Sequence, residues 1–211
     1  MSIIAIVPIK EKSFRLPGKN FLDFCGKPLY RWVVDAALAT SLIDRVYISS
    51  SWDEFKDEIK KVYGGKVWWV ERPDDLNHVE LMEVMQHAGK LVGKEGDIFM
   101  QLSPTKPLTS SKDLEEYILT FLEGKYDSLS QVQAIKTAVD GEYKEATDKG
   151  KMHFMSCATA KMWEYNTLRH AKKGTFGIGE RHHYLTIAPY HIEIDTEEDF
   201  RIAEALKRVG F

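Results

Sequence analysis

Cysteine is scarce in this chain, and the two that it has, Cys25 and Cys157, belong to no CxxC or Cys/His motif. A disulfide scaffold is therefore excluded, and a reducing compartment is expected. Long apolar runs are also lacking, since none approaches the roughly 18 residues that a membrane span requires. The apolar stretch at the N-terminus stops after about six residues and has no basic region before it, so we expect no signal peptide. These absences predict a cytoplasmic protein with no membrane partner.

An excess of positive charge is absent too. The 211 residues include 29 Lys and Arg against 32 Asp and Glu, which gives a formal charge of −3. This balance argues against a nucleic-acid-binding surface, and local concentrations of charge must carry any phosphate binding. Hydrophobic residues make up 44% of the chain, enough for an ordinary packed core. The length suits one compact domain over residues 1–211.

Short β-branched runs alternate with amphipathic stretches in much of the chain. The predicted strands cover residues 3–9, 45–50, 66–70, 97–101, 128–135 and 190–195. The predicted helices cover residues 28–39, 53–62, 79–92 and 196–209. A further helix is predicted to begin at the capping-box pair Ser110 and Asp113. This βαβα order predicts an α/β fold, with a mostly parallel sheet and helices on both faces. A looser, polar stretch near residues 136–160 is predicted to form an excursion or hairpin that contributes to dimerisation.

The first candidate site is the polar loop after the first strand. It contains four cations and one acid: Lys10, Lys12, Arg15, Lys19 and Glu11. Ligands of open α/β sheets bind beyond the carboxyl ends of the strands, where this loop is expected. Its cations and the backbone amides near Gly18 are suited to a triphosphate, although a solvated basic loop is the alternative. The loop is neither a Walker A nor a GxGxxG motif, which argues against the common ATPase and dinucleotide-binding classes.

The second candidate site lies near the C-terminus. In an extended strand, Glu193 and Asp195 would face the same side, with Cα atoms about 6.5 Å apart. Two such carboxylates make an oxygen site of the kind that Mg²⁺ accepts together with substrate phosphates. The alternative is that the acids of this segment only begin the last helix, and we prefer it for Glu197, Glu198 and Asp199.

A third segment, Ser103-Pro104-Thr105-Lys106-Pro107-Leu108, follows a predicted strand and forms a rigid loop at the same sheet edge. Taken in order, the three segments resemble the CMP-N-acylneuraminate (nonulosonate) synthetases, a family of cytidylyltransferases. The segments that carry the resemblance are residues 3–8, 13–20, 26–29, 72–76, 103–108 and 192–199. The string Ser13-Phe14-Arg15-Leu16-Pro17-Gly18-Lys19 also resembles the related 3-deoxy-manno-octulosonate cytidylyltransferases.

The resemblance implies a Rossmann-like nucleotide-diphospho-sugar transferase fold and a Mg²⁺-dependent enzyme. The implied reaction transfers CMP from CTP to the anomeric hydroxyl of an acidic 2-keto sugar, a sialic-acid-like nonulosonate, and releases pyrophosphate. A homodimer is implied as well. The implied catalytic residues are Lys10, Arg15, Lys19 and Asp195. The implied nucleotide-binding residues are Lys10, Ser13, Arg15, Lys19, Asn20, Ser103 and Thr105. The implied ligands of Mg²⁺ are Glu193 and Asp195.

The chain departs from the family pattern at a few of these positions. Lys10 stands where the family carries Arg, Ser103 where it carries Gln, Thr109 where it carries Arg, and Glu193 where it carries Asp. Two alternatives therefore stay open. One is a nucleotidyltransferase for a sugar 1-phosphate or another phosphorylated or phosphonate acceptor. The other is a nucleotide-binding homologue without catalysis, which retention of both C-terminal carboxylates disfavours.

Overall fold

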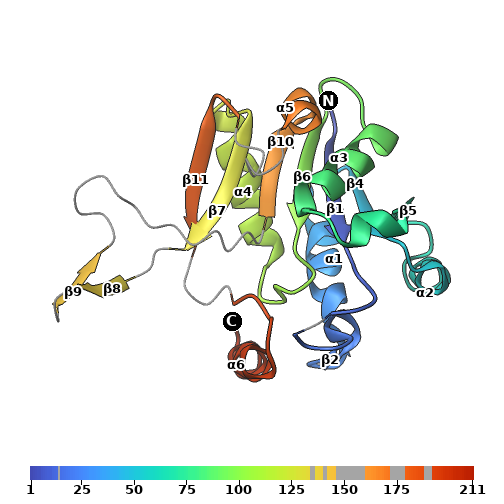
Figure 1. Cartoon of the computed structure of the whole chain (residues 1–211). Helices are drawn as coiled ribbons and strands as arrows, with labels where there is room; N and C mark the ends of the chain where they lie inside the picture. Colours follow the sequence, from blue (N-terminus) through green and yellow to red (C-terminus); the bar gives the residue numbers. More distant parts are fainter. Residues whose placement is uncertain (14, 134–135, 140–141, 146–159, 172–178, 188–191) are drawn as a thin grey trace.

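The computed structural model describes residues 1–13, 15–133, 136–139, 142–145, 160–171, 179–187 and 192–211. Within these residues, seven strands form one sheet in the order β11-β7-β10-β6-β1-β4-β5 (Figure 1). The strands are β1 (Ile3–Pro8), β4 (Arg45–Ser50), β5 (Val67–Glu71), β6 (Ile98–Leu102), β7 (Ser128–Gln133), β10 (Ala160–Glu164) and β11 (His182–Ile187). The helices are α1 (Leu29–Ala39), α2 (Asp53–Tyr63), α3 (Leu81–Val92), α4 (Ser111–Glu123), α5 (Tyr165–His170) and α6 (Glu197–Arg208).

The sheet is mostly parallel, which confirms the predicted fold class. Only β10 is reversed among its described strands, and it pairs antiparallel with both β6 and β7. The chain passes from β1 outward to β4 and β5, and then returns to β6 on the other side of β1. The carboxyl ends of β1 and β6 therefore meet where the strand order reverses, which is the usual ligand site of such sheets.

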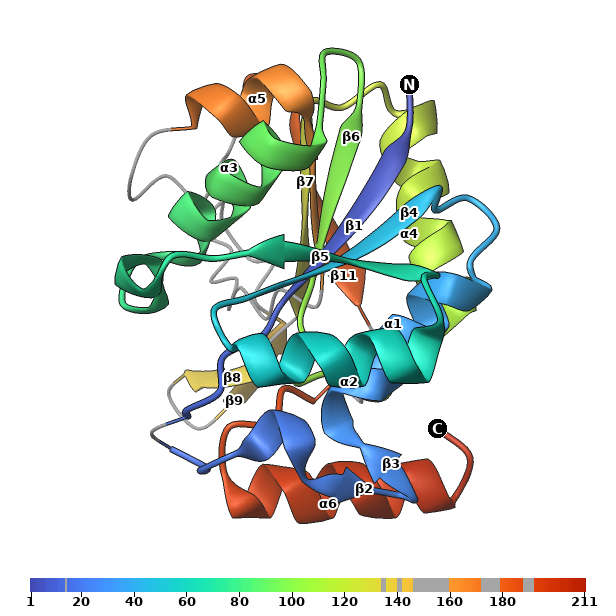
Figure 2. The same cartoon turned by 90° about the vertical axis from the view of Figure 1, so that its right-hand side faces the viewer.

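Helices cover both faces of the sheet, as predicted (Figure 2). Along β1, Ala5 and Val7 pack in one core cluster with residues of α1, α2 and α4. Ile4 and Ile6 point to the opposite face and pack with α3 and α5. Side chains of a strand alternate between the two faces, so a strand covered on both sides is apolar throughout. This is the physical reason for the unbroken apolar run in the sequence.

Helix α6 lies beyond the carboxyl edge of the sheet, next to the hairpin of β2 (Asp23–Phe24) and β3 (Lys27–Pro28) (Figure 2). A small core cluster joins these parts through Phe24, Leu29, Ile194 and Ala203. A capping box begins the helix: the Thr196 hydroxyl accepts a hydrogen bond from the Asp199 amide at 3.2 Å. The segment before α6 is thereby held against the loop that follows β1.

The predicted elements agree with the structure to within about two residues at most ends, with one exception. The strand predicted at residues 190–195 is wrong for its described part, since residues 192–195 form no strand. Among the described residues, a single backbone hydrogen bond ties this segment to the sheet edge, from the Ile194 amide to the Thr105 carbonyl at 2.9 Å. One backbone hydrogen bond is too few to pair this segment with a strand. Residues 190 and 191 lie outside the described part of the chain.

The excursion near residues 136–160 contains the predicted hairpin, made of β8 (Lys136–Val139) and β9 (Glu142–Glu145). Figure 1 draws this hairpin away from the main sheet. Residues 146–159 lie outside the described part, so the role of the excursion in dimerisation stays a prediction. None of the helices that the structure describes is long and apolar enough to span a bilayer.

We predict that Ile6→Ala lowers the free energy of unfolding by about 2–5 kcal/mol, because it opens a cavity beneath α3 in a closely packed core. Ile6 is fully buried in the central strand. The matched control is Trp68→Ala on the edge strand β5, where the side chain is 43% exposed, and a smaller loss is expected. Urea denaturation monitored by circular dichroism measures both. Equal losses would contradict the assignment of the core.

Candidate active site

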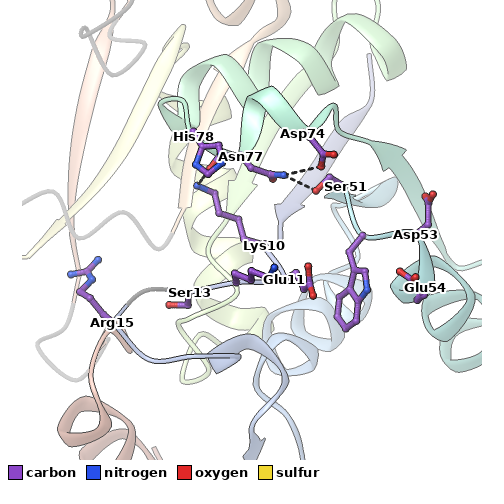
Figure 3. A pocket seen from close by; sticks show the side chains of 12 residues that line it. Lys10, Glu11, Ser13, Arg15, Ser51, Asp53, Glu54, Asp74, Asn77 and His78 are labelled. Atoms are coloured by element: carbon purple, nitrogen blue, oxygen red, sulfur yellow. Dashed lines mark hydrogen bonds between the residues drawn. The ribbon is translucent and has the colours of Figure 1, made fainter.

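A pocket of about 660 Å³ lies beyond the carboxyl ends of β1, β4 and β5 (Figure 3). Its walls are the loop after β1, the residues from the end of β4 into α2, and the short helix η2 (Asp74–Asn77) after β5. The lining residues are Lys10, Glu11, Lys12, Ser13, Arg15, Ser51, Trp52, Asp53, Glu54, Asp74, Asn77 and His78. Three of the predicted phosphate-binding residues, Lys10, Ser13 and Arg15, are among them.

The charges around this pocket are arranged unevenly. Its cations all come from the loop after β1 and are Lys10, Lys12 and Arg15. Its acids come mainly from the opposite wall and are Glu11, Asp53, Glu54 and Asp74. The pocket therefore offers an anion one favourable wall, while the other wall favours hydrogen-bond donors.

Lys10 is fixed between two walls of the pocket. Its ammonium donates a hydrogen bond to the Asn77 backbone carbonyl at 2.5 Å, and its own backbone carbonyl accepts one from the Asn20 side-chain Nδ2 at 3.0 Å. The Asn77 side chain in turn donates to the Ser51 hydroxyl at 2.7 Å (Figure 3). The Lys10 side chain is exposed overall, but burial of its ammonium, and then the nearby Arg72 charge, lower its pKa. The loop after β1 thus holds a cation that releases its proton more readily than usual.

Arg72, the residue after β5, supports this loop from below. It is only 2% exposed, and its guanidinium donates a hydrogen bond to the Ile9 carbonyl at 2.6 Å. Burial lowers the pKa of Arg72 to about 10. The sequence resemblance included Arg72 but assigned it no role. The structure places its guanidinium against the Ile9 carbonyl, where it holds the start of the loop in position.

Asp195 joins the loop after β1 to the C-terminal segment. One carboxylate oxygen pairs with the Arg15 guanidinium at 2.8 Å, and the other pairs with the Lys19 ammonium at 2.7 Å. Lys19 also donates to the Ile194 carbonyl at 2.7 Å. Its side chain is 12% exposed, whereas that of Arg15 is 69% exposed and reaches the rim of the pocket. Three of the predicted catalytic residues therefore meet at one point.

The loop after β6 completes the arrangement. The hydroxyls of Ser103 and Thr105 lie 2.8 Å apart, and both residues are buried. The Thr105 hydroxyl donates to the exposed Glu193 carboxylate at 3.4 Å. Ser103, Thr105 and Glu193 thus lie together at the carboxyl edge of the sheet. They do not line the pocket, and neither do Lys19, Asn20 and Asp195.

The donors for a divalent cation are limited to a pair of carboxylates. Among the residues that the structure describes, no three or more His, Cys, Asp or Glu side chains gather to hold a metal ion. Mg²⁺, however, is commonly held by one or two carboxylates together with substrate phosphates and water. Glu193 is exposed, and Asp195 presents two oxygens that now pair with cations. This oxygen donor set fits Mg²⁺ when a phosphate ligand supplies the remaining contacts.

The family model for the cytidylyltransferases matches residues 4–202, and the chain belongs to this family. Curated relatives include the 3-deoxy-manno-octulosonate cytidylyltransferase of Escherichia coli, which is 28% identical over 124 residues, or 59% of this chain and 46% of that protein. The pseudaminic acid cytidylyltransferase of Campylobacter jejuni is 30% identical over 130 residues, or 59% of this chain and 55% of that protein. The chain spans about half the length of these two relatives in the matches.

Solved structures agree on the fold. A CMP:2-keto-3-deoxy-manno-octonic acid synthetase complexed with CTP is similar with a TM-score of 0.74 and 16% identity, over 100% of both chains. The 4-diphosphocytidyl-2C-methyl-D-erythritol synthase of Anaerococcus prevotii gives a TM-score of 0.71 at 13% identity, over 98% of both chains. The predicted nucleotidyltransferase fold is therefore confirmed.

The Lys10 environment predicts a pH dependence of anion binding. A protonated Lys10 attracts phosphate, so its contribution is complete below its pKa and is lost as the pH rises through that value. Because this pKa is lowered, the affinity for a triphosphate should begin to fall at a lower pH than it would around a lysine with the ordinary pKa of 10.5. In Lys10→Arg the guanidinium stays protonated, and the decline with rising pH should be smaller. Dissociation constants from calorimetry measure this, and identical declines would contradict it.

Proposed function

We propose that the protein transfers CMP from CTP to the anomeric hydroxyl of an acidic 2-keto sugar and releases pyrophosphate. The observation that carries the proposal is the meeting of Arg15 and Lys19 with Asp195, beside a pocket whose cations all come from the loop after β1. This arrangement supports the proposal, because it brings cations suited to phosphate and a carboxylate together at the edge where ligands of open α/β sheets bind. Membership of the cytidylyltransferase family supports the choice of CTP.

The reaction is an in-line displacement at the α-phosphorus of CTP. The bond between the acceptor oxygen and the α-phosphorus forms while the bond to the pyrophosphate oxygen breaks, and the hydroxyl proton passes to water. Such transfers depend mainly on positioning and on neutralising charge. Lys10, Arg15 and Lys19 would bind the phosphates, with a hydrogen bond from Ser13. Asn20, Ser103 and Thr105 would fix the two loops that shape the nucleotide site.

Glu193 and Asp195 would hold Mg²⁺. When bound, the ion supplies a positive charge that stabilises the phosphate oxygens and the attacking oxygen. Without ligand, Asp195 is neutralised by Arg15 and Lys19. On binding of a triphosphate, Arg15 and Lys19 would turn from Asp195 to the phosphates, which would leave the Glu193 and Asp195 carboxylates to hold the ion. Homodimerisation through the β8–β9 hairpin and a cytoplasmic location belong to the same proposal.

The test is pyrophosphate release by the purified protein with Mg²⁺, in which each of the four ribonucleoside triphosphates is combined with a panel of acceptors. The panel contains 3-deoxy-manno-octulosonate, pseudaminic acid, N-acetylneuraminate and sugar 1-phosphates. We expect release with CTP and one 2-keto acid, and loss of release when EDTA removes Mg²⁺. Pyrophosphate release only with a phosphorylated acceptor would show that the acceptor is a sugar phosphate and not a 2-keto acid. Binding of CTP without any pyrophosphate release would contradict catalysis.

We predict that Asp195→Asn lowers kcat by at least about 100-fold, or about 2.7 kcal/mol of transition-state stabilisation, because the ligand charge for the metal is lost. The fold should persist, since such partly exposed ion pairs contribute little to stability. The matched control is Glu198→Gln, an exposed acid in the first turn of α6, which should retain nearly full activity. Steady-state kinetics together with thermal unfolding measure both variants. A near-normal rate in Asp195→Asn would refute the metal assignment.

A further inference from the structure

A row of polar side chains crosses the sheet on the face that α3 and α5 cover. Gln101 of β6 pairs in register with Lys161 of β10, and Lys161 pairs in turn with Ser130 of β7. The three residues are 2%, 7% and 6% exposed. On the same two strands and the same face, Phe99 and Trp163 belong to the apolar core. On this face of the sheet, the side chains thus change from apolar to polar at this row.

The polar row lies close to the catalytic edge. Gln101 is the second-last residue of β6, and Ser103 follows it by two residues, a rise of about 6.6 Å along an extended chain. Lys161 lies one strand away, about 4.8 Å across the sheet. Because β10 runs antiparallel to β6, its first residues lie at the carboxyl edge of β6. The long side chain of Lys161 is therefore within reach of the loop that holds Ser103 and Thr105.

A polar row in this position is costly for the fold. Burial disfavours the charged form of Lys161 and lowers its pKa. The buried Oε1 of Gln101 accepts no hydrogen bond within the part of the chain that the structure describes. An apolar side chain at position 101 would avoid the cost of the unpaired Gln101 oxygen, as Phe99 does two residues earlier on the same face. Buried groups of this kind at the edge of an active site are candidates for ligand contacts.

We propose that Lys161 binds the carboxylate of the acidic acceptor, with Gln101 accepting a hydrogen bond from one of its hydroxyls. The inference rests on the proposed function and names the residue that selects an anionic acceptor. The pocket lies beyond β1, β4 and β5, whereas Lys161 lies on the other side of β1, beyond β6. An acceptor held at Lys161 would approach the α-phosphorus from the side opposite the pocket, as in-line displacement requires. The cations of the pocket then remain available for the triphosphate.

The test measures binding rather than turnover. The protein is saturated with the non-reacting analogue α,β-methylene-CTP and Mg²⁺, and calorimetry follows the binding of 3-deoxy-manno-octulosonate, pseudaminic acid and N-acetylneuraminate. The methyl ester of each acid is its neutral counterpart, and glucose 1-phosphate represents a phosphate anion. The variants are Lys161→Met, Lys161→Arg, and the control Lys60→Met in the last turn of α2, where the side chain is exposed. Thermal unfolding checks that each variant is folded.

We expect the wild type to bind one acid at least tenfold more tightly than its methyl ester. Lys161→Met should lose this preference and bind the acid at least tenfold more weakly, while Lys161→Arg and Lys60→Met retain it. Affinity for the CTP analogue should be unchanged in all three variants. Equal affinity of Lys161→Met and wild type for the acid would overturn the inference. So would the absence of binding by any acid, or binding of glucose 1-phosphate alone.

Failure of the proposed function would give a different pattern. Lys161-dependent binding of an acid, without pyrophosphate release from CTP, would refute the proposed function and leave the anion site standing. Pyrophosphate release with an acceptor whose affinity is the same in Lys161→Met would support the function and overturn the role of Lys161.

Discussion

The pairing of Asp195 with Arg15 and Lys19 is the interaction on which the candidate site depends, because it joins the two ends of the chain: Lys19 and Asp195 lie 176 positions apart. Two features of the backbone prepare it. Ile194 is fully buried between the β2–β3 hairpin and α6. The amide of Asp195 donates to the Asp199 carboxylate at 3.1 Å, so the helix cap also orients the residue before it. A core contact and a helix cap thus place one carboxylate against two cations.

Most of the fold could be predicted from local patterns, because each pattern has a local physical cause. The apolar run of β1 indicates burial on both faces, and the Ser110–Asp113 capping box begins α4. The local patterns did not indicate strands β10 and β11 or helix α5. Two further features could not be predicted in this way. The reversed position of β10 between β6 and β7 is decided by strand pairing between distant segments. The sequence at residues 192–195 alternates like a strand, but no neighbour offers it more than one described backbone hydrogen bond.

The site was predictable in part for the same reason. The basic loop and the C-terminal carboxylates have spacings that imply chemistry by themselves, and the structure brings Arg15, Lys19 and Asp195 together. The opposite wall of the pocket gave no such signal. Asp53 and Glu54 in the first turn of α2 have a sufficient local explanation, since acids stabilise helix N-termini. Only the arrangement of the strands shows that these acids also line the pocket.

The acids of the pocket also bear on how a triphosphate would lie in it. At short range, a polyanion is repelled by Asp53, Glu54 and Asp74 and attracted by Lys10, Lys12 and Arg15. The difference between the two walls favours one orientation, with the phosphates along the loop after β1 and the nucleoside toward the acids. In this orientation the phosphates lie on the wall that contains Arg15, and Arg15 already contacts Asp195. Under the proposed function, this orientation would direct the reacting phosphorus toward Glu193 and Asp195 and toward the side of the sheet where Lys161 lies.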